Sequence, residues 1–354
     1  MNDKIIQAGL IGFGLAGQTF HAPLIRTTPG LRLAAVASSD ARKVHAALGD
    51  DVTVVGDPHA LVDDDGIDLV VIASPNATHY DLALRAIARG RHVVVDKPFT
   101  ATLREAQTLA QRAREKGVVL SVYHNRRWDS STLSARRVLA SGMLGEVRHA
   151  AMHFDRFRPA PTARWKEDAA AGGGVWPDLG PHLLDEALLY FGMPAAIQAD
   201  IAGLRPGTRA DDMFQVRLRY ASGLRVDLGA SMLGAMPRPR LTLQGTRGSY
   251  VKRHLDPQEA ALKAGRLPPG DDAAWGADDD AGVALVADEK VEGGLQSIAV
   301  PTENGAYPAY YRQLRDAILG RGPNPVPPEQ AVDVMRLLEA GRRSSEERRE
   351  IALA

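Results

Sequence analysis

The strongest constraint on the fold is a regular alternation of short apolar runs and longer helix-like segments over residues 1–124. The apolar runs are mostly β-branched, which is typical of strands buried on both faces of a sheet. They lie at 5–11, 31–37, 52–55, 67–73, 92–95 and 118–122, with helix-like segments at 17–27, 41–47, 78–89 and 103–116. This alternation with short links predicts an N-terminal α/β domain built on a doubly wound parallel sheet.

Residues 125–354 follow a different pattern and are expected to form a second domain. Helices are expected at 128–140 and 178–191, a strand at 145–154, and closing helices at 307–319 and 329–345. Between 197 and 250 strand follows strand, and segments such as FQVRLRY alternate apolar with polar residues. Such alternation indicates a sheet with one apolar face and a second face that is exposed to solvent or covered in a different way. We therefore predict an α+β domain with a large, mostly antiparallel open sheet.

Composition excludes several classes of function. The 43 basic residues equal the 43 acidic ones, so no basic field attracts nucleic acid or an anionic membrane. The chain has no cysteine, which excludes disulfides, thiolate catalysis and cysteine-bound metal. No apolar stretch or N-terminal pattern indicates a membrane span or signal peptide, and a cytoplasmic protein is expected.

An acidic segment at 268–282, PPGDDAAWGADDDAG, carries five aspartates. The ligand spacing of an EF-hand is absent, so the segment is expected to be a solvated loop rather than a calcium site. We predict no metal site elsewhere in the chain.

The first apolar run leads directly into Gly12-x-Gly14-x-x-Gly17. A glycine pattern alone is weak evidence, but this one follows a predicted strand and opens a predicted helix, as in a Rossmann dinucleotide-binding domain. Gly12 would permit a tight turn, Gly14 the approach of a pyrophosphate and Gly17 close packing of helix on strand. The alternative is a glycine-rich turn that binds nothing.

The end of the second predicted strand distinguishes the two nicotinamide cofactors. An acidic residue there usually binds the ribose 2′-hydroxyl of NAD, and here Ser38 and Ser39 occupy the position. The cations Arg42 and Lys43 follow one helical turn later, so the pattern favours a 2′-phosphate and hence NADP, with NAD left possible. Asp40 would be the ribose ligand if the register differs by two residues; otherwise it is the N-cap of the next helix.

Two further segments follow predicted strands of the same sheet. Pro75, Asn76 and Thr78 come after the fourth strand, where open α/β folds bind ligands, although Thr78 alone could cap the next helix. Lys97 and Pro98 come after the fifth strand, at the edge where a nicotinamide is expected. A cation there can polarise the oxygen of an alcohol or ketone.

Asp96 precedes this lysine and is expected to hold or orient its charge. The alternative for Lys97 is a surface lysine that closes a strand. The chain has 8 lysines and 35 arginines, which favours a lysine chosen for its chemistry. An X–Pro bond at Lys97 and Pro98 also leaves the cis form open.

The segment DLGPHLLD places Asp178 and His182 four residues apart, so a helix presents them on one face, with Asp185 on the same side. Asp178 could be a helix N-cap and His182 a satisfied core histidine. We expect His182 in the first helical turn, where the dipole favours the neutral imidazole of a general base. His182 would then take the hydroxyl proton as hydride leaves a carbinol carbon, while Lys97 stabilises the developing oxygen charge.

These motifs resemble the Gfo/Idh/MocA oxidoreductases over essentially the whole chain. GFGLAG, DKP at 96–98 (where most members have Glu-Lys-Pro) and DLGPH at 178–182 carry the resemblance. Longer segments such as SVYHNRRWDS and LDPQEAALKAG are similar to the NADP-dependent scyllo-inositol dehydrogenase-like branch. The resemblance implies an oxidoreductase of a cyclic polyol or sugar, and a homo-oligomer, dimer or tetramer, that forms through the open sheet.

The resemblance also implies roles for individual residues. Lys97, Asp178 and His182 become the catalytic set and, with Arg126, contact the substrate. Asn125 borders the nicotinamide, and Arg164 with Trp165 closes over the cofactor. The alternatives are a solvated Arg126–Arg127 pair and core or interface roles for Trp128 and Trp165.

Two other functions stay open at this point. One is a regulator that binds dinucleotide without turnover, and the other is an NAD-dependent dehydrogenase of a different sugar. A regulator has no need of a cleft lysine with an Asp-x-x-x-His partner, so the catalytic set favours the enzyme.

Overall fold

The computed structural model describes residues 4–162, 167–268 and 274–353. The chain forms two compact units, each assembled from three segments. The parallel-sheet unit comprises Met1–Asn125, Pro257–Trp275 and Ala306–Met335. The mixed-sheet unit comprises Arg126–Asp256, Gly276–Gly305 and Arg336–Ala354. No helix in the described part is long and apolar enough to cross a membrane.

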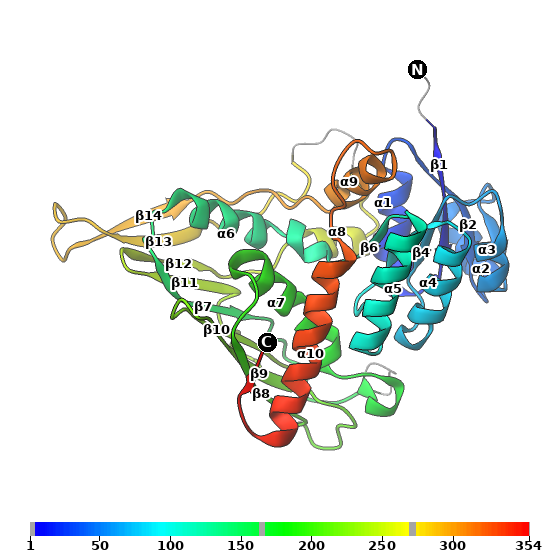
Figure 1. The fold of residues 1–354 in the computed structure, drawn as a ribbon. Coiled ribbons are helices and arrows are strands. Elements are labelled where there is room, and N and C mark those ends of the chain that lie inside the picture. Colours follow the sequence, from blue (N-terminus) through cyan, green and yellow to red (C-terminus); the bar gives the residue numbers. More distant parts are fainter. Residues whose placement is uncertain (1–3, 163–166, 269–273, 354) are drawn as a thin grey trace. The chain divides into compact units, whose positions relative to one another are not determined.

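The parallel-sheet unit confirms the predicted doubly wound sheet (Figure 1). Its six strands pair in the order β3-β2-β1-β4-β5-β6, and every pair is parallel. This order reverses direction next to β1, at the point where open α/β sheets bind their ligands. The strands are β1 (Ile6–Ile11), β2 (Leu31–Ala37), β3 (Thr53–Val55), β4 (Leu69–Ile72), β5 (His92–Val95) and β6 (Leu120–Val122).

Short helices connect these strands. The helix predicted at 17–27 is divided into a π-helical turn and a short α-helix, and α3, which has only six residues and begins with a proline, was not predicted. The best-capped helix is α5, where Thr102 and Glu105 form a capping box and Gly117 ends the helix in a left-handed conformation. The elements are η1 (Gly17–His21), α1 (Ala22–Arg26), α2 (Ala41–Leu48), α3 (Pro58–Asp63), η2 (Asn76–Thr78), α4 (His79–Ala88) and α5 (Leu103–Lys116).

Distant parts of the chain complete this unit. Helices α8 (Gln258–Lys263) and α9 (Pro308–Ile318) belong to it, and so does the start of α10 (Pro328–Glu347). Helix α9 contributes Tyr310 and Tyr311, and its N-cap residue is Tyr307, all three fully buried. Tyr310 and Tyr311 pack edge-on against each other, with ring centroids 5.2 Å apart. The closing helix predicted at 307–319 therefore exists and supplies part of the aromatic core of the parallel-sheet unit.

The mixed-sheet unit contains nine strands in the order β14-β13-β12-β11-β7-β10-β9-β8-β15. All neighbours are antiparallel except β7 and β10, so the predicted large and mostly antiparallel sheet is confirmed. The strands β13, β14 and β15 were not predicted. The strands are β7 (Val147–His153), β8 (Ala196–Ala202), β9 (Met213–Arg219), β10 (Arg225–Ser231), β11 (Leu241–Gly245), β12 (Gly248–Lys252), β13 (Gly282–Ala287), β14 (Leu295–Val300) and β15 (Ile351–Ala352).

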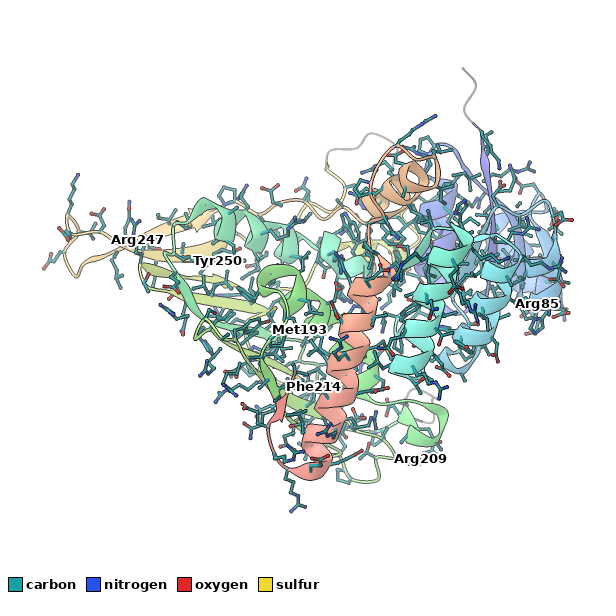
Figure 2. The ribbon with its side chains drawn as sticks, viewed as in Figure 1. Arg85, Met193, Arg209, Phe214, Arg247 and Tyr250 are labelled. Atoms are coloured by element: carbon teal, nitrogen blue, oxygen red, sulfur yellow. The ribbon has the colours of Figure 1, made fainter. Side chains whose placement is uncertain are left out.

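Helix α7 (Val175–Phe191) covers one face of this sheet by packing on β9 and β10. Trp176 of α7 is buried against Phe214 of β9, with ring centroids 5.0 Å apart, and Phe214 and Tyr250 mark two of the inward-facing positions on the strands (Figure 2). The unit also contains η3 (Asn125–Trp128) at its border, α6 (Ser130–Ser141) and η5 (Ala169–Ala171).

The expectation of a solvated loop at 268–282 is wrong for two of its aspartates. The side chains of Asp278 and Asp280 are 5% and 10% exposed, and both pair with the fully buried Lys252 at 2.9 and 3.0 Å. Asp278 also accepts a hydrogen bond from the Ser130 hydroxyl at 2.6 Å. A buried ammonium needs such partners, and here they come from a segment that composition alone made look solvent-exposed. Asp271 and Asp272 lie outside the described residues.

Candidate functional site

The three glycines of the loop after β1 have distinct surroundings. Gly12 has φ +94°, and a Cβ there would lie 2.6 Å from the Ala73 carbonyl oxygen. At Gly17 a Cβ would lie 2.1 Å from the Gly12 carbonyl oxygen. A Cβ on Gly14 meets nothing within 4 Å. Gly12 and Gly17 are therefore required by backbone packing, whereas Gly14 leaves an open cradle at the start of η1. The loop fits a dinucleotide pyrophosphate, which needs this close approach.

The end of β2 lies beside this loop, because Ala37 pairs with Ile11 at the end of β1. The Asp40 side chain accepts a hydrogen bond from the Lys43 amide at 3.0 Å, which confirms the prediction that Asp40 is the N-cap of α2. Lys43 donates from Nζ to the Phe13 carbonyl at 2.9 Å, so its ammonium is held at the glycine loop. Ser38 is partly exposed, while Ser39 and Arg42 are exposed.

The segment after β4 is held by hydrogen bonds of its own. The Thr78 hydroxyl donates to the Pro75 carbonyl at 2.8 Å, and no side-chain bond from Thr78 caps α4. The buried His79 contacts the carbonyl oxygens of Ser74 and Pro98, each at 3.0 Å. Each ring nitrogen therefore faces one carbonyl oxygen, one from the segment after β4 and one from the segment after β5. His79 therefore links the ends of β4 and β5, a role that sequence reasoning missed.

Lys97 follows β5, and its bond to Pro98 is cis. The Lys97 amide donates to Asp96 Oδ1 at 2.8 Å. On the other side of this carboxylate, Oδ2 lies 3.9 Å from Nε2 of the fully buried His21. Burial raises the pKa of Asp96, but His21 and the charges of Lys97 and His79 outweigh it and hold that pKa below its usual value. Asp96 is therefore an ionised carboxylate at the base of the lysine.

These four segments meet at one edge of the parallel sheet. Ile11, Ala37, Ile72 and Val95 end their strands in register, because Ile11 pairs with both Ala37 and Ile72, and Ile72 pairs with Val95. The structure thus brings together the glycine loop, residues 38–43, residues 74–79 and residues 96–98.

Arg126 and Arg127 are buried, so their interpretation as a solvated pair is wrong. Arg126 pairs with Asp129 at 3.1 Å and stacks 4.6 Å from the Phe154 ring centroid. Arg127 makes two hydrogen bonds to Asp185, at 2.8 and 2.6 Å. Asp185 therefore anchors η3 to α7. The neighbouring residues Asn125 and Trp128 are also buried, and Arg164 and Trp165 lie outside the described residues.

Helix α7 begins at Val175, three residues before the predicted start. Asp211 holds this start by accepting hydrogen bonds from the amides of Val175 and Trp176. Asp178 is therefore not an N-cap. His182 lies beyond the second turn, and the dipole argument for a neutral imidazole at this position is wrong because the effect falls off within the first turn. Asp178 and His182 remain one turn apart on one continuous helix, with Asp178 half-buried and His182 buried.

One turn beyond His182, Glu186 forms a buried ion pair with Arg240, and each side chain is 2% exposed. Burial raises the pKa of Glu186 to about 7, and the nearby charge of Asp129 adds to the effect, while Arg240 opposes it. Arg126, Arg156 and Arg240 all stack on Phe154. Sequence reasoning missed this cluster, because its members come from η3, α7, the segment after β7 and the residue before β11.

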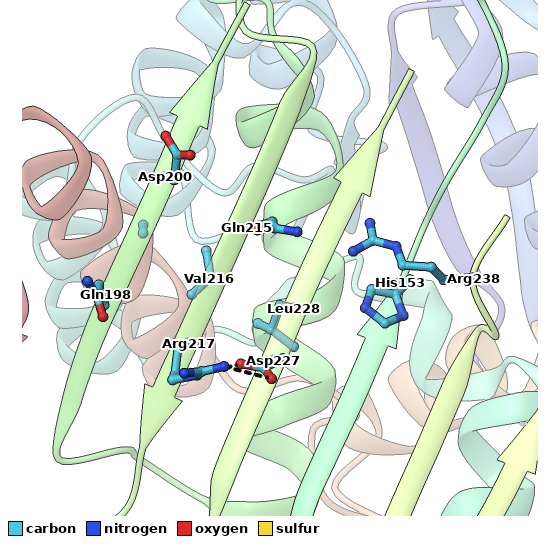
Figure 3. A pocket seen from close by; sticks show the side chains of 10 residues that line it. His153, Gln198, Asp200, Gln215, Val216, Arg217, Asp227, Leu228 and Arg238 are labelled. Atoms are coloured by element: carbon cyan, nitrogen blue, oxygen red, sulfur yellow. Dashed lines mark hydrogen bonds and ion pairs between the residues drawn. The ribbon is translucent and has the colours of Figure 1, made fainter. Parts of the chain in front are cut away.

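A hollow of about 360 Å³ opens on the polar face of the nine-stranded sheet (Figure 3). Gln198 and Asp200 of β8, with Arg217 of β9, are among its lining residues, and Arg217 pairs with Asp227 at 2.8 Å. None of the predicted site residues lines it. No group of three or more His, Asp or Glu side chains in the described residues could hold a metal ion.

Two family models match the chain. Residues 6–124 match the NAD-binding Rossmann fold of an oxidoreductase family, and residues 136–353 match its C-terminal α/β domain. The chain belongs to the Gfo/Idh/MocA oxidoreductase family. Its parallel-sheet unit therefore contains the Rossmann domain in which members of the family bind NAD(P), in agreement with the geometry of the glycine loop.

Relatives align over nearly the full length. An uncharacterised oxidoreductase of Escherichia coli, YdgJ, is 49% identical over all of both chains. The NADP-dependent scyllo-inositol 2-dehydrogenase IolW of Bacillus subtilis is 35% identical over 98% of this chain and 96% of its own. A solved oxidoreductase from Bacillus cereus is 31% identical over 99% of each chain, with a TM-score of 0.88.

Alanine substitutions should separate the roles of two loop glycines. Gly14→Ala should leave the melting temperature unchanged and weaken NADP⁺ binding on the order of tenfold or more, about 1.4 kcal/mol, because the methyl group occupies the open cradle. Gly17→Ala should weaken binding and also lower stability by about 1–3 kcal/mol, because the methyl group overlaps the Gly12 carbonyl. Calorimetric titration and thermal melts measure both effects. Unchanged affinity in Gly14→Ala would place the pyrophosphate elsewhere.

Glu186 should make stability depend on pH. Its folded-state pKa of about 7 lies above the ordinary value of 4.5, so the folded state binds more protons within this window. The free energy of unfolding should therefore fall as pH rises from 4.5 to 7. Glu186→Gln should remove this contribution, which amounts to at most about 3 kcal/mol. Denaturant unfolding from pH 4.5 to 7.5 tests it, with the exposed Glu289→Gln as the control. A parallel pH response of parent and Glu186→Gln would contradict the raised pKa.

Proposed function

We propose that this protein is an NADP(H)-dependent oxidoreductase that moves hydride between the nicotinamide and a secondary alcohol or ketone of a cyclic polyol, with scyllo-inositol and scyllo-inosose as the leading pair. The observation that carries the proposal is the 35% identity to the NADP-dependent scyllo-inositol 2-dehydrogenase of Bacillus subtilis over nearly both whole chains. The scyllo-inositol 2-dehydrogenase of Bacillus subtilis that uses NAD⁺ is 29% identical over 53% of this chain. Similarity to relatives alone therefore does not decide between NADP and NAD.

The proposed chemistry divides among three side chains. In polyol oxidation the bound nicotinamide accepts the hydride from the carbinol carbon. His182 takes the hydroxyl proton as general base, and returns it as general acid in the reverse direction. Lys97 stabilises the partial negative charge on the reacting oxygen, supported by the ionised Asp96 beneath it. Asp178, one turn from His182, anchors a neighbouring hydroxyl or joins the proton relay, and Arg126 contributes to substrate contact.

NADP preference is proposed to rest on residues 38–43. No carboxylate occupies position 38 or 39, and Asp40 is engaged as the cap of α2. The hydroxyls of Ser38 and Ser39 with the cation of Arg42 would accept a 2′-phosphate, and Lys43 holds the adjacent loop. Pro75, Asn76 and Pro98, at the ends of the neighbouring strands, and Asn125 are proposed to complete the cofactor contacts. The family resemblance adds Trp165, which lies outside the described residues.

A homo-oligomer is proposed through the open face of the nine-stranded sheet. This face exposes Val283 and Leu285 of β13 at 42% and 43%. Exposed apolar side chains on the face that also carries the hollow of Figure 3 are typical of a surface that a second copy covers. A solution mass of one chain by analytical ultracentrifugation would contradict this assembly.

The function is tested by incubating the purified protein with scyllo-inositol and either NADP⁺ or NAD⁺, and following the absorbance of the reduced cofactor. We expect turnover with NADP⁺. Lys97→Ala should lower turnover at least about 100-fold with little change in cofactor affinity, because Lys97 acts on the reacting oxygen. Lys116→Ala, at an exposed lysine of α5, is the matched control.

Each outcome of this assay has a separate meaning. Near-normal turnover in Lys97→Ala would remove that residue from the catalytic set. No turnover of scyllo-inositol by a parent that binds cofactor would contradict the substrate and direct the assay to other sugars in both directions. Failure with all of them would favour a dinucleotide-binding regulator.

Cofactor choice is tested separately with Ser38→Asp. The new carboxylate should repel the 2′-phosphate and accept the ribose 2′-hydroxyl, so NADP⁺ affinity should fall by roughly tenfold or more while NAD⁺ affinity rises. Ser38→Asn adds similar bulk without charge and should change the ratio of the two affinities much less. An unchanged NADP⁺ affinity in Ser38→Asp would exclude Ser38 from the ribose pocket.

A further inference from the structure

A buried polar network lies behind Lys97 within the parallel-sheet unit. Its members are Asp96 at the end of β5, His21 at the end of η1 and Tyr311 on α9, and we call them the His21 network. Nδ1 of His21 lies 2.6 Å from the Tyr311 hydroxyl, and Nε2 lies 3.9 Å from Asp96 Oδ2. His21 and Tyr311 are completely buried. The other oxygen of Asp96 accepts the Lys97 amide proton at 2.8 Å.

The hydrogen-bonding roles within the network follow from its chemistry. Burial and the nearby phenols of Tyr123 and Tyr310 raise the pKa of Tyr311 well above its ordinary value, so its hydroxyl stays protonated and can donate. Nε2 faces the Asp96 carboxylate across 3.9 Å, which is beyond hydrogen-bond distance, so the interaction between the two side chains is electrostatic. Donation from the Tyr311 hydroxyl to Nδ1 corresponds to the tautomer whose Nε2–H points toward Asp96. Tyr123, whose ring centroid is 4.4 Å from that of His21, holds the imidazole in this orientation.

We propose that His21 is a positioning residue for Lys97. It holds the Asp96 carboxylate in the orientation that binds the Lys97 amide, and Tyr311 fixes the imidazole for that task. His21 ends the helical turn that Gly17 begins, so the network also connects the glycine loop to the lysine. The inference deepens the proposed function, because it concerns the residue that polarises the reacting oxygen there. No sequence motif of the chain indicated a role for His21 or Tyr311.

The surroundings offer a matched pair of substitutions. Tyr310 and Tyr311 are adjacent, equally buried and part of one aromatic cluster. Tyr311 contacts His21, whereas the Tyr310 hydroxyl donates to Ser121 Oγ at 2.9 Å. Tyr311→Phe and Tyr310→Phe each remove one buried hydroxyl, and only the first acts on His21. His21→Phe keeps an aromatic ring beside Tyr123 and removes both nitrogens.

The first readout is independent of any substrate. The chain contains eight lysines, so selective ¹⁵N-lysine labelling gives at most eight backbone amide signals, and Lys97→Arg assigns the one from Lys97. His21→Phe and Tyr311→Phe should shift the Lys97 amide signal, because its acceptor Asp96 reorients. Tyr310→Phe should leave it in place. A Lys97 signal that is unmoved in His21→Phe, or equally moved in all three variants, would overturn the proposal.

The second readout is turnover. His21→Phe should lower kcat by roughly 10- to 100-fold, since small misplacements of a reacting group have costs of this size, with an unchanged NADP⁺ dissociation constant. Tyr311→Phe should also lower kcat, and Tyr310→Phe should have the same kcat as the parent. In a Lys97→Ala background His21→Phe should lower kcat no further, because two residues that act as a unit are non-additive. Additive losses would mean a general structural effect and overturn the proposal.

Failure of this inference can be distinguished from failure of the proposed function. If the parent turns over no polyol, the proposed function fails, and the Lys97 amide signal still decides whether His21 holds Asp96 against Lys97. If the parent is active and the amide shifts while kcat stays at the parent value, the proposed function stands and the positioning role is overturned.

Discussion

The parallel-sheet unit depends on one close approach of backbone to backbone. Helix η1 starts so near the end of β1 that a single methyl group at Gly17 would overlap the Gly12 carbonyl oxygen. This contact sets where η1 begins and therefore where its terminal residue, His21, lies behind β5. The same turn leaves the space over Gly14 open. This one contact therefore fixes how β1, η1 and the glycine loop pack together. The ends of the neighbouring strands lie beside that loop.

The parallel sheet could be predicted in detail because its signals are local. The strands are short, mostly apolar and buried runs, and Gly12 and Gly17 of the loop are required by their immediate surroundings. Asp40 as a helix cap is a similar case, since its partner is the amide of Lys43 three residues away. The strands β13 and β14 were missed because they are partly exposed and carry little periodic signal.

The interactions that escaped prediction join distant parts of the sequence. Lys252 is neutralised by Asp278 and Asp280, and Arg127 by Asp185, 58 residues away. Composition predicts such charges to be solvated, because the cost of burying them is offset only by partners that the fold brings together. The error at the start of α7 has the same origin. Asp211, on a different segment, holds the helix end three residues earlier than the local sequence indicates.

The segmented construction of the parallel-sheet unit has a consequence for synthesis. All six of its strands have been synthesised once residue 122 is made, yet α9, which supplies the partner of His21, follows some 190 residues later. Until then His21 and Tyr123 lack the tyrosines that cover them in the finished unit. A sheet that forms before α9 is made therefore has an incomplete core. Residues 126–305, between the first and last segments of this unit, include most of the other unit, so most of the mixed-sheet unit is synthesised before α9.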